Sequence, residues 1–423
     1  MKHWWQDAFF YHIYPLGFCG AEPENPAPGQ GMGPGADAGG AGGAPDRLAR
    51  IGDALGEIAA TGCNAIYLGP VLESSRHGYD TADYYHTDRR LGDNAALARL
   101  VERIHEAGMH VILDGVFHHV GRDFWAFRKL REEGEQSAYR SWFRGVDFSA
   151  DNRFGDGFVY HGWEGNDELV ALDLTNPDVV EHLLGAVEWM MRGLGIDGLR
   201  LDVAYLLNAD FMRALRERTE AVAADLGGEG FWLMGEAIHG DYTELVAPDR
   251  LHSATNYECY KGLWSSHNDR NFFEIAHSLS RQFAPGGIYE GMLLYNFADN
   301  HDVDRVASLL EEPGHLYPLY ALLMTMPGIP SVYYGSEYGR RGVRRDGSDR
   351  DLRPRWEDID RSDPGLRDHL AELQALRLEH PALRVGGYRR LHVDHTTLVF
   401  ERTAAGGAAG ATGDGGTAAA AGE

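Results

Sequence analysis

The sequence predicts an α/β fold, a (β/α)8 (TIM) barrel with a small excursion domain after the third strand and a short C-terminal β-domain that is reduced or incomplete. Three observations support this prediction. Short apolar segments alternate with amphipathic helical patterns, and eight such strand segments can be found. The chain has 423 residues, of which 43% are hydrophobic. That length suits one barrel of about 250 residues with insertions.

The strand segments follow one another in a regular pattern. The first is expected at residues 9–14, where aromatic and β-branched residues are followed by a proline. A helix beginning near Asp46 then leads to a strand at residues 65–68. Repetition of this unit implies parallel strands joined by crossover helices. The remaining strands are expected at residues 111–113, 196–199, 231–234, 254–257, 293–296 and 330–333.

Composition divides the chain into parts. The barrel is expected to comprise residues 1–116 and 176–363. Residues 117–175 are too many for an ordinary loop and are rich in aromatic side chains, so they predict an excursion domain over the barrel mouth. Residues 364–402 predict a helix and the start of the C-terminal β-domain. Residues 403–423 form a Gly/Ala-rich tail that cannot build a core and is expected to be disordered.

Charge and cysteine content exclude several functions. The net charge is -25, with 64 acidic against 39 basic residues, which argues against a nucleic-acid partner or an anionic membrane surface and favours a neutral substrate. Cys19, Cys63 and Cys259 lack the spacing of a zinc site and are expected to be reduced. Neither a signal peptide nor a membrane-helix pattern is found, so a cytoplasmic location is expected, with no membrane partner. The oligomeric state is left open.

Polar residues gather where four of the expected strands end. They are Asp114–His119 after the third strand, Arg200 and Asp202 at the fourth, Glu236 at the fifth and Asn300–Asp302 after the seventh. In a parallel barrel these strand ends face one shared bowl, where reacting groups collect. One such segment has a simple structural explanation, as a cap or a loop. Four on one rim predict a functional site.

These segments read DGVFHHVG, GIDGLRLDVA, LMGEAIHG and FADNHDVDR. They resemble the four signature regions of the α-amylase family of glycoside hydrolases. HGYDTADYYHTDRRLGDN, LDLTNPDV and MPGIPSVYYGSEYG add to the resemblance, which covers about residues 8–356 in the family's order. The wording is most similar to the neopullulanase and cyclomaltodextrinase branch, although that branch's extra N-terminal domain is not found.

The resemblance implies cleavage of α-linked glucose with retention of anomeric configuration. It makes Asp202 the nucleophile, Glu236 the acid/base, and Asp302 the carboxylate that stabilises the transition state. A retaining glycosidase needs two carboxyl groups about 5 Å apart, a spacing that adjacent barrel strands provide. Arg200, two residues before Asp202 on the same strand, is expected to keep it ionised, while an apolar strand favours a protonated Glu236. Asp114 is expected to orient Arg200.

Further substrate contacts are also implied by the resemblance. His119 and His301 would bind hydroxyls of the sugar, Tyr79 would stack on its ring, and Asp80 would reach its outer hydroxyls. The alternative for Tyr79 and Asp80 is a core tyrosine and a turn aspartate. Aromatic residues of the excursion domain, such as Trp163, are either sugar platforms or the core of that domain.

The sequence departs from the family pattern at positions that concern calcium. His118 stands where the family often has a calcium-binding asparagine, and calcium prefers oxygen ligands. The Gly-rich segment at residues 20–45, expected to be mobile, lacks the clustered Asn and Asp of a second calcium site. We therefore expect no cofactor and no essential metal.

A second departure concerns the shape of the site. Related enzymes acting on small oligosaccharides carry an arginine that pairs with the equivalent of Asp80 and closes the pocket. Arg353, in LRPRW, is the candidate, but its spacing differs. A closed pocket and an open groove both remain consistent with the sequence.

Three functions are consistent with the sequence. The leading one is hydrolysis of α-1,4 or α-1,6 bonds in maltodextrins, cyclodextrins or related α-glucans, which makes an α-glucan oligosaccharide the expected partner. The second is glucan transfer or isomerisation, such as trehalose formation, which shares the covalent intermediate and changes the acceptor. The third is a catalytically inactive carbohydrate-binding barrel, because fold alone does not imply function. The presence of three carboxylates and both histidines favours an enzyme.

Overall fold

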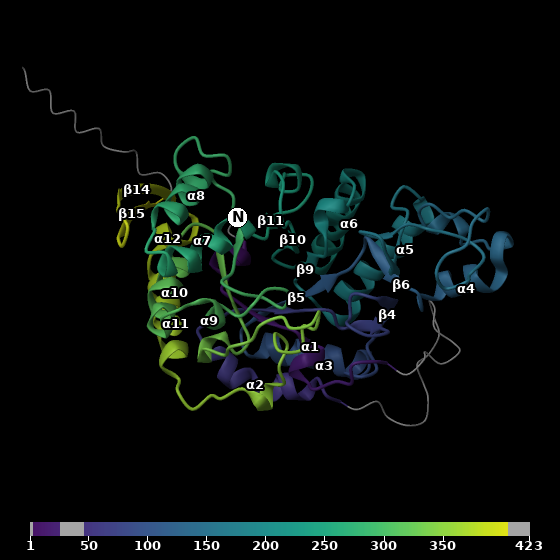
Figure 1. Ribbon diagram of the computed structural model, residues 1–423, viewed down its shortest axis with the longest axis horizontal. Helices are drawn as coiled ribbons and strands as arrows, with labels where there is room; N and C mark the ends of the chain where they lie inside the picture. The colour runs from purple at the N-terminus through teal and green to yellow at the C-terminus, as the bar shows by residue number, and fades with distance from the viewer. Residues whose placement is uncertain (1–2, 26–45, 405–423) are drawn as a thin grey trace, which may run out of the picture.

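The computed structural model describes residues 3–25 and 46–404 (Figure 1). Its main sheet has eight parallel strands in the order β11-β10-β9-β5-β2-β1-β13-β12. The predicted eight-stranded barrel is confirmed. The strands are β1 (Phe10–Ile13), β2 (Ala65–Leu68), β5 (His110–Gly115), β9 (Gly198–Leu201), β10 (Trp232–Gly235), β11 (Ser253–Ala254), β12 (Tyr295–Asn296) and β13 (Ile329–Tyr333).

The barrel closes between β11 and β12 by a short seam. One parallel bridge joins Thr255 to Tyr295, and the N–H of Asn256 donates to the Tyr295 carbonyl at 2.8 Å. Side-chain amides extend this contact, since Asn256 Nδ2 donates to Asn296 Oδ1 at 2.9 Å and lies 3.1 Å from Gln282 Oε1. The seam therefore depends more on side chains than on a strand ladder.

Helices cover the outside of the barrel, as Figure 1 shows. The connection from β10 to β11 differs from the predicted alternation, because its described residues form the 3-10 turn η6 (Tyr242–Glu244) and no α-helix. Gly240, with φ +100°, and Pro248 interrupt the segment. The covering helices are α2 (Ala49–Ala59), α3 (Asn94–Glu106), α5 (Pro177–Trp189), α6 (Ala209–Leu226), α7 (Tyr257–Asn268), α8 (Phe273–Phe283), α10 (Leu316–Thr325) and α11 (Gly365–Glu379).

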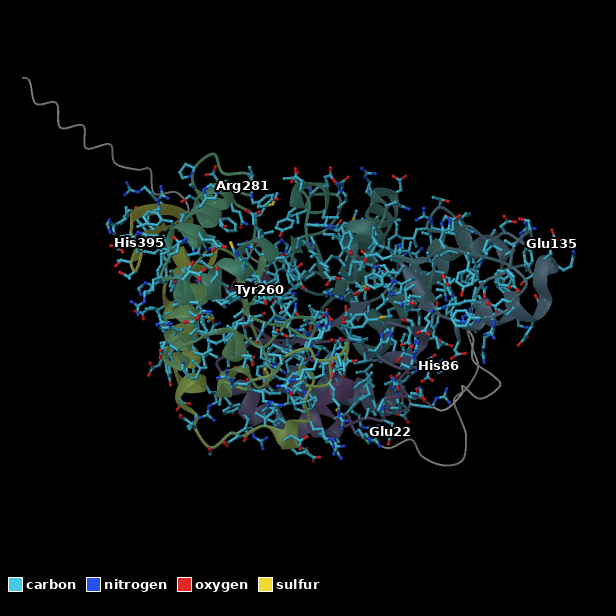
Figure 2. The ribbon with its side chains drawn as sticks, in the orientation of Figure 1. Glu22, His86, Glu135, Tyr260, Arg281 and His395 are labelled. Atoms are coloured by element: carbon cyan, nitrogen blue, oxygen red, sulfur yellow. The ribbon has the colours of Figure 1, made fainter. Side chains whose placement is uncertain are left out.

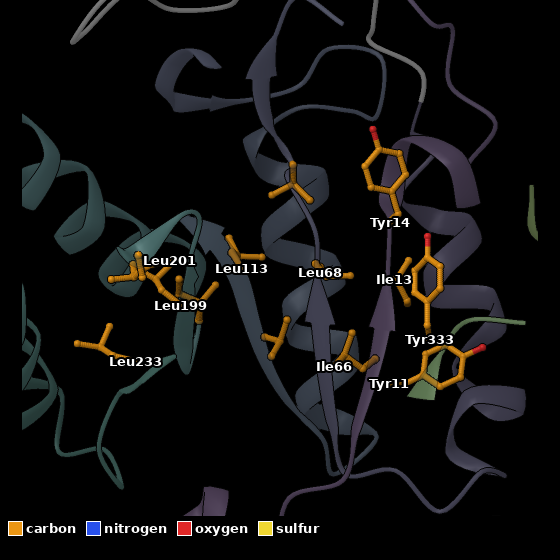
Figure 3. Packing of buried hydrophobic residues seen from close by; sticks show 14 of the residues in the cluster. Tyr11, Ile13, Tyr14, Ile66, Leu68, Leu113, Leu199, Leu201, Leu233 and Tyr333 are labelled. Carbon is orange, nitrogen blue, oxygen red and sulfur yellow. The ribbon is translucent and has the colours of Figure 1, made fainter. Parts of the chain in front are cut away.

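Side chains alternate between the two faces of the barrel strands. One set, which includes Leu68, Leu113 and Leu199, packs in the layer between strands and helices (Figure 3). The other set forms a separate buried cluster with Tyr67 and Trp232 among its members. Because side chains alternate along each strand, this second face continues to the polar residues that follow the apolar ones.

Two appendages flank the barrel. Between β5 and β9 lies the excursion domain, with the sheet β6 (His119–Gly121), β8 (Asn166–Ala171) and β7 (Gly162–Trp163) and the helix α4 (Trp125–Glu133). After α11 come α12 (Pro381–Val385) and an antiparallel pair, β14 (Gly387–Val393) and β15 (Leu398–Thr403). Glu135 in the first and His395 in the second mark opposite ends of the molecule (Figure 2).

Some predicted features lie beyond what the structure describes. Residues 26–45 of the predicted Gly-rich loop and residues 405–423 of the predicted tail are outside the described residues. Within the described ranges, no helix has both the length and the apolar character needed to cross a membrane.

The close approach of three strands at Gly198 gives a test of the fold. A Cβ at this position would lie 2.4 Å from the Trp232 carbonyl oxygen and 2.9 Å from Ile112 Cγ2. We expect Gly198→Ala to lower the free energy of unfolding by about 2 kcal/mol or more, because backbone would have to move. Urea unfolding followed by circular dichroism measures this. Gly56→Ala, where a Cβ meets nothing within 4 Å, is the control and should cost nothing. Equal losses in the two variants would contradict the argument.

Candidate active site

A cavity of about 530 Å³ opens at the C-terminal ends of the barrel strands. Asp202 follows β9, Glu236 follows β10 and Asp302 follows β12, and all three line this cavity. The structure thus brings together the three carboxylates predicted from the sequence. The other lining residues are His77, Tyr79, His119, Trp163, Asn166, Leu169, Val203, Ile238, Tyr257, Val303, Arg344, Asp349 and Arg353.

Arg200 binds two of these carboxylates, Asp202 and Glu236, and a third acid, Asp114. In the sheet it is aligned with Asp114 of β5 on one side and with β10 on the other. Its Nη1 donates to Asp114 Oδ1 at 2.7 Å and to Asp202 Oδ1 at 2.8 Å, and its Nη2 lies 2.8 Å from Glu236 Oε1. Only 3% of Arg200 is exposed. Its planar guanidinium, with donors in fixed directions, therefore sets the positions of acids from three adjacent strands.

Val203 holds Glu236 from a second direction. Its φ of 42° and ψ of 46° place a β-branched residue in the left-handed region, which costs free energy. In this conformation the Val203 N–H donates to Glu236 Oε2 at 3.0 Å. Both oxygens of Glu236 are therefore bound, one by Arg200 and one by strained backbone next to Asp202.

Asp302 is held by a different pair of basic side chains. His301 Nε2 lies 2.8 Å from Asp302 Oδ2, and Arg353 Nη2 lies 3.1 Å from Asp302 Oδ1. Arg353 also donates from Nε to the His301 carbonyl at 3.1 Å and pairs with Asp349 at 3.0 Å. The Tyr79 ring stacks on the His301 ring with centroids 5.4 Å apart, and the Tyr79 hydroxyl contacts His301 Nε2.

These surroundings give the carboxylates different acidities. Burial raises the pKa of Asp202, with Arg200 opposing the rise and Glu236 adding to it. Burial likewise raises the pKa of Glu236 against the opposing effect of Arg200. At Asp302 burial acts in the same direction, but His301 and Arg353 outweigh it and hold the pKa well below its ordinary range. Asp302 is therefore anionic near neutral pH, while the buried pair Asp202 and Glu236 favours keeping one proton between them.

The predicted histidines and Tyr79 lie around the carboxylates. His119 Nε2 is 3.9 Å from Asp202 Oδ2 and has no hydrogen-bond partner among the described residues. Burial lowers the pKa of His119 to about 3, so the ring is neutral. Tyr79 lines the cavity, whereas His301 stacks against the Tyr79 ring. The Trp163 ring lies 5.9 Å from that of His119, which brings the excursion domain to the cavity wall.

Asp80 is the predicted site residue that the structure places elsewhere. It is 2% exposed, its carboxylate lies 3.7 Å from both Arg76 Nε and His77 Nδ1, and it borders a second cavity. Arg353, the candidate to pair with Asp80, pairs instead with Asp302 and Asp349. The loop after β13 therefore contacts the carboxylate at the end of β12 directly, without the bridge to Asp80.

Several lining residues were not predicted. Val203 directly follows Asp202, and Ile238 lies two residues after Glu236. His77 begins the segment that contains Tyr79. Closeness in sequence to a predicted site residue was therefore the available signal. Arg344 and Asp349 reach the cavity from the loop after β13. Nothing in their local sequence pattern marks them, because an irregular loop has no periodicity to indicate where its side chains point.

No metal-binding cluster is found in the described ranges. Groups of three or more His, Cys, Asp or Glu suited to a metal ion are absent there. His118, in place of the family's asparagine, has its Nδ1 at 3.3 Å from His119 Nδ1, and burial lowers its pKa to about 4.

Comparison with known proteins places the chain in a family. The catalytic-domain model of alpha-amylases matches residues 13–371. The chain belongs to the α-amylase family. Neopullulanase 2 of Thermoactinomyces vulgaris is 31% identical over 412 residues, covering 94% of this chain and 67% of the relative. A cyclomaltodextrinase of a Bacillus species is 30% identical over 393 residues, covering 92% and 68%. The resemblance seen in the four strand-end segments is confirmed.

Solved structures agree with this family assignment. The debranching enzyme of Nostoc punctiforme superposes with a TM-score of 0.78 at 27% identity, covering 95% of this chain and 87% of that one. A ligand-free cyclic alpha-maltosyl-(1→6)-maltose hydrolase of Arthrobacter globiformis superposes with a TM-score of 0.75 at 28% identity, covering 96% and 90%. This α-amylase family member is a glycoside hydrolase that acts on O-glycosyl bonds.

Replacing Arg200 by Lys tests whether the fork geometry is required. Lysine keeps the charge but offers a single ammonium, which cannot serve three acids in fixed directions. We expect Arg200→Lys to lower kcat/KM by about 100-fold or more and the free energy of unfolding by about 3 kcal/mol. Steady-state kinetics and urea unfolding measure both. A variant with near-normal activity would show that charge alone suffices.

The raised pKa of Asp202 predicts a pH-dependent stability effect. A carboxyl whose pKa is higher in the folded than in the unfolded protein costs stability once pH exceeds its unfolded value, about 4. Asp202→Asn lacks this cost. We therefore expect the unfolding free energy of the variant, relative to that of wild type, to rise from pH 5 to pH 7. Thermal and urea unfolding at both pH values measure the change, and a relative loss over this interval would reverse the sign we assign.

Proposed function

We propose that this chain is a retaining hydrolase of α-1,4 and/or α-1,6 glucosidic bonds in short α-glucans such as maltodextrins and cyclodextrins. The observation that carries the proposal is the triad of carboxylates at one cavity, two of them held by Arg200 and the third by His301 and Arg353. The substrate class is supported by relatives named cyclomaltodextrinase and neopullulanase. A partner of this kind is neutral, in keeping with the net charge of -25.

In the first step Glu236 donates its proton to the glycosidic oxygen while Asp202 attacks the anomeric carbon. Arg200 binds Asp202 Oδ1, so Oδ2, which accepts no hydrogen bond among the described residues, is the attacking oxygen. The bond to the leaving sugar breaks as the Asp202 ester forms. Loss of the Glu236 proton restores a carboxylate beside the guanidinium, which stabilises it.

In the second step Glu236 removes a proton from water, and the water oxygen attacks the anomeric carbon. Asp202 leaves as a carboxylate, and two inversions give net retention. The ionised Asp302 stabilises positive charge on the sugar ring in both transition states and accepts hydrogen bonds from its hydroxyls. His119 Nε2, which has no hydrogen-bond partner within residues 3–25 and 46–404, is available to a sugar hydroxyl, and Tyr79 offers a ring face.

Hydrolysis and glucan transfer share this intermediate, and they differ in whether water or a sugar accepts it. Products longer than the substrate would identify transfer.

We also propose a cytoplasmic location, supported by an intracellular maltogenic amylase of Bacillus subtilis that is 28% identical over 347 residues. Cys19, Cys63 and Cys259 are buried and free, as suits a reducing compartment.

The separate roles of Asp202 and Glu236 can be tested with a substrate whose leaving group needs no proton. On maltotriose we expect Asp202→Asn and Glu236→Gln each to lose about 10²–10⁴-fold or more in kcat. On α-maltosyl fluoride Glu236→Gln should still form the ester on Asp202, detectable by mass spectrometry, whereas Asp202→Asn should not. For wild type, NMR should show the α-anomer as the first product. A β-anomer as the first product would contradict the retaining mechanism and indicate an inverting one.

We further propose that the enzyme needs no metal. Incubation with EDTA followed by desalting should leave kcat/KM and Tm unchanged, and added calcium should have no effect on either. Magnesium at equal concentration controls for non-specific binding to this acidic protein. A drop in Tm with EDTA that calcium alone restores would identify a structural calcium site instead.

A further inference from the structure

The loop that follows β13 concentrates positive charge in an otherwise acidic chain. Residues 340–355 contain seven arginines and three aspartates, whereas the whole chain has a net charge of -25. A tight turn at Asp346 and Gly347, with φ of 52° and 74°, folds part of this loop back on itself. The Arg345 N–H lies 3.3 Å from the Ser348 carbonyl, and the Ser348 N–H donates to the Arg345 carbonyl at 2.8 Å. The turn therefore sets Arg345 beside Ser348.

This loop lines an open cavity at the surface, beside the catalytic one. The cavity has a volume of about 350 Å³, and its wall contains five arginines and two aspartates, together with Ser348. One aspartate, Asp351, is already paired with Arg340 at 3.3 Å. Within the described residues, Arg345 and Arg350 form no ion pair, and the buried Arg340 Nε has no hydrogen-bond partner. Arg345 and Arg350 are exposed, so their guanidinium groups are available to an anion from solution.

Arg353 connects this cavity to the catalytic site. It lines both cavities and is 12% exposed at its side chain. Besides its contacts with Asp302 and Asp349, its Nη1 lies 3.3 Å from the Tyr14 hydroxyl. A charge placed in the arginine-lined cavity therefore lies next to the cation that holds Asp302.

We propose that the arginine-lined cavity binds a phosphate group. Guanidinium groups bind phosphate through paired hydrogen bonds in one plane, and the unpaired Arg345 and Arg350 with the Ser348 hydroxyl supply both charge and donors. A neutral sugar offers no charge to pair with these groups. The phosphate belongs either to a free ion or small sugar phosphate, or to a phosphorylated glucan whose chain lies in the catalytic cavity. This second source rests on the proposed function, whereas the binding site itself does not.

The binding test uses the full chain and isothermal titration with inorganic phosphate and with glucose 6-phosphate. Potassium chloride at equal ionic strength controls for screening. We expect Arg345→Gln and Arg350→Gln each to weaken Kd by about tenfold or more, since each removes a charge-assisted contact. Arg341→Gln is the matched control, because Arg341 lies in the same loop but does not line the cavity, and its Kd should match wild type. Circular dichroism verifies that all variants fold.

A second measurement distinguishes the two sources. Maltotetraose with and without a 6-phosphate is compared by kcat/KM in wild type and in the same variants. A wild-type preference for the phosphorylated sugar that Arg345→Gln loses assigns the site to the substrate, while phosphate binding without such a preference assigns it to a free ion. Titration does not depend on turnover, so the binding test can still be interpreted if the proposed hydrolysis is not observed. The proposal is overturned if neither phosphate compound nor the phosphorylated sugar binds better than chloride, or if Arg341→Gln loses as much affinity as Arg345→Gln.

Discussion

Asp114, Asp202 and Glu236 come from three neighbouring strands and meet at one guanidinium. Without Arg200 these buried carboxylates would repel one another, and burial would favour their neutral forms. The contact requires the observed strand register, in which Arg200 is aligned with Asp114 and lies beside β10. A shift of one residue would turn the arginine to the opposite face of the sheet. The barrel and the candidate active site therefore depend on the same alignment.

A second pair of basic side chains, His301 and Arg353, gives Asp302 a different environment. Asp202 and Glu236 share Arg200 and have raised pKa values, whereas Asp302 contacts His301 and Arg353 and has a lowered pKa. Three chemically similar acids thus differ because of what surrounds them. Environment of this kind allows carboxyl groups in one site to act as acid, nucleophile and fixed charge.

The sequence predicted those parts of the molecule that follow from periodicity. The eight strands were found because apolar residues repeat in short runs, and the three carboxylates were found because polar residues follow those runs. Asp80 was expected at the substrate, yet it lies beside a different cavity, since the hairpin of β3 (Leu72–Ser74) and β4 (Thr81–Thr87) sets its direction. The contacts of Arg353 and Asp349 depend on the conformation of an irregular loop, and no sequence rule describes that conformation.

The closing seam of the barrel affects how activity is lost on heating. It joins two strands of two residues each and relies on the amides of Asn256 and Asn296. Glu236 lies one strand before this seam and Asp302 directly after it. Fraying at the seam would move these acids apart while the other six strands stayed paired. Heat inactivation of this enzyme should then begin below the temperature at which its helices melt, and it should reverse on cooling.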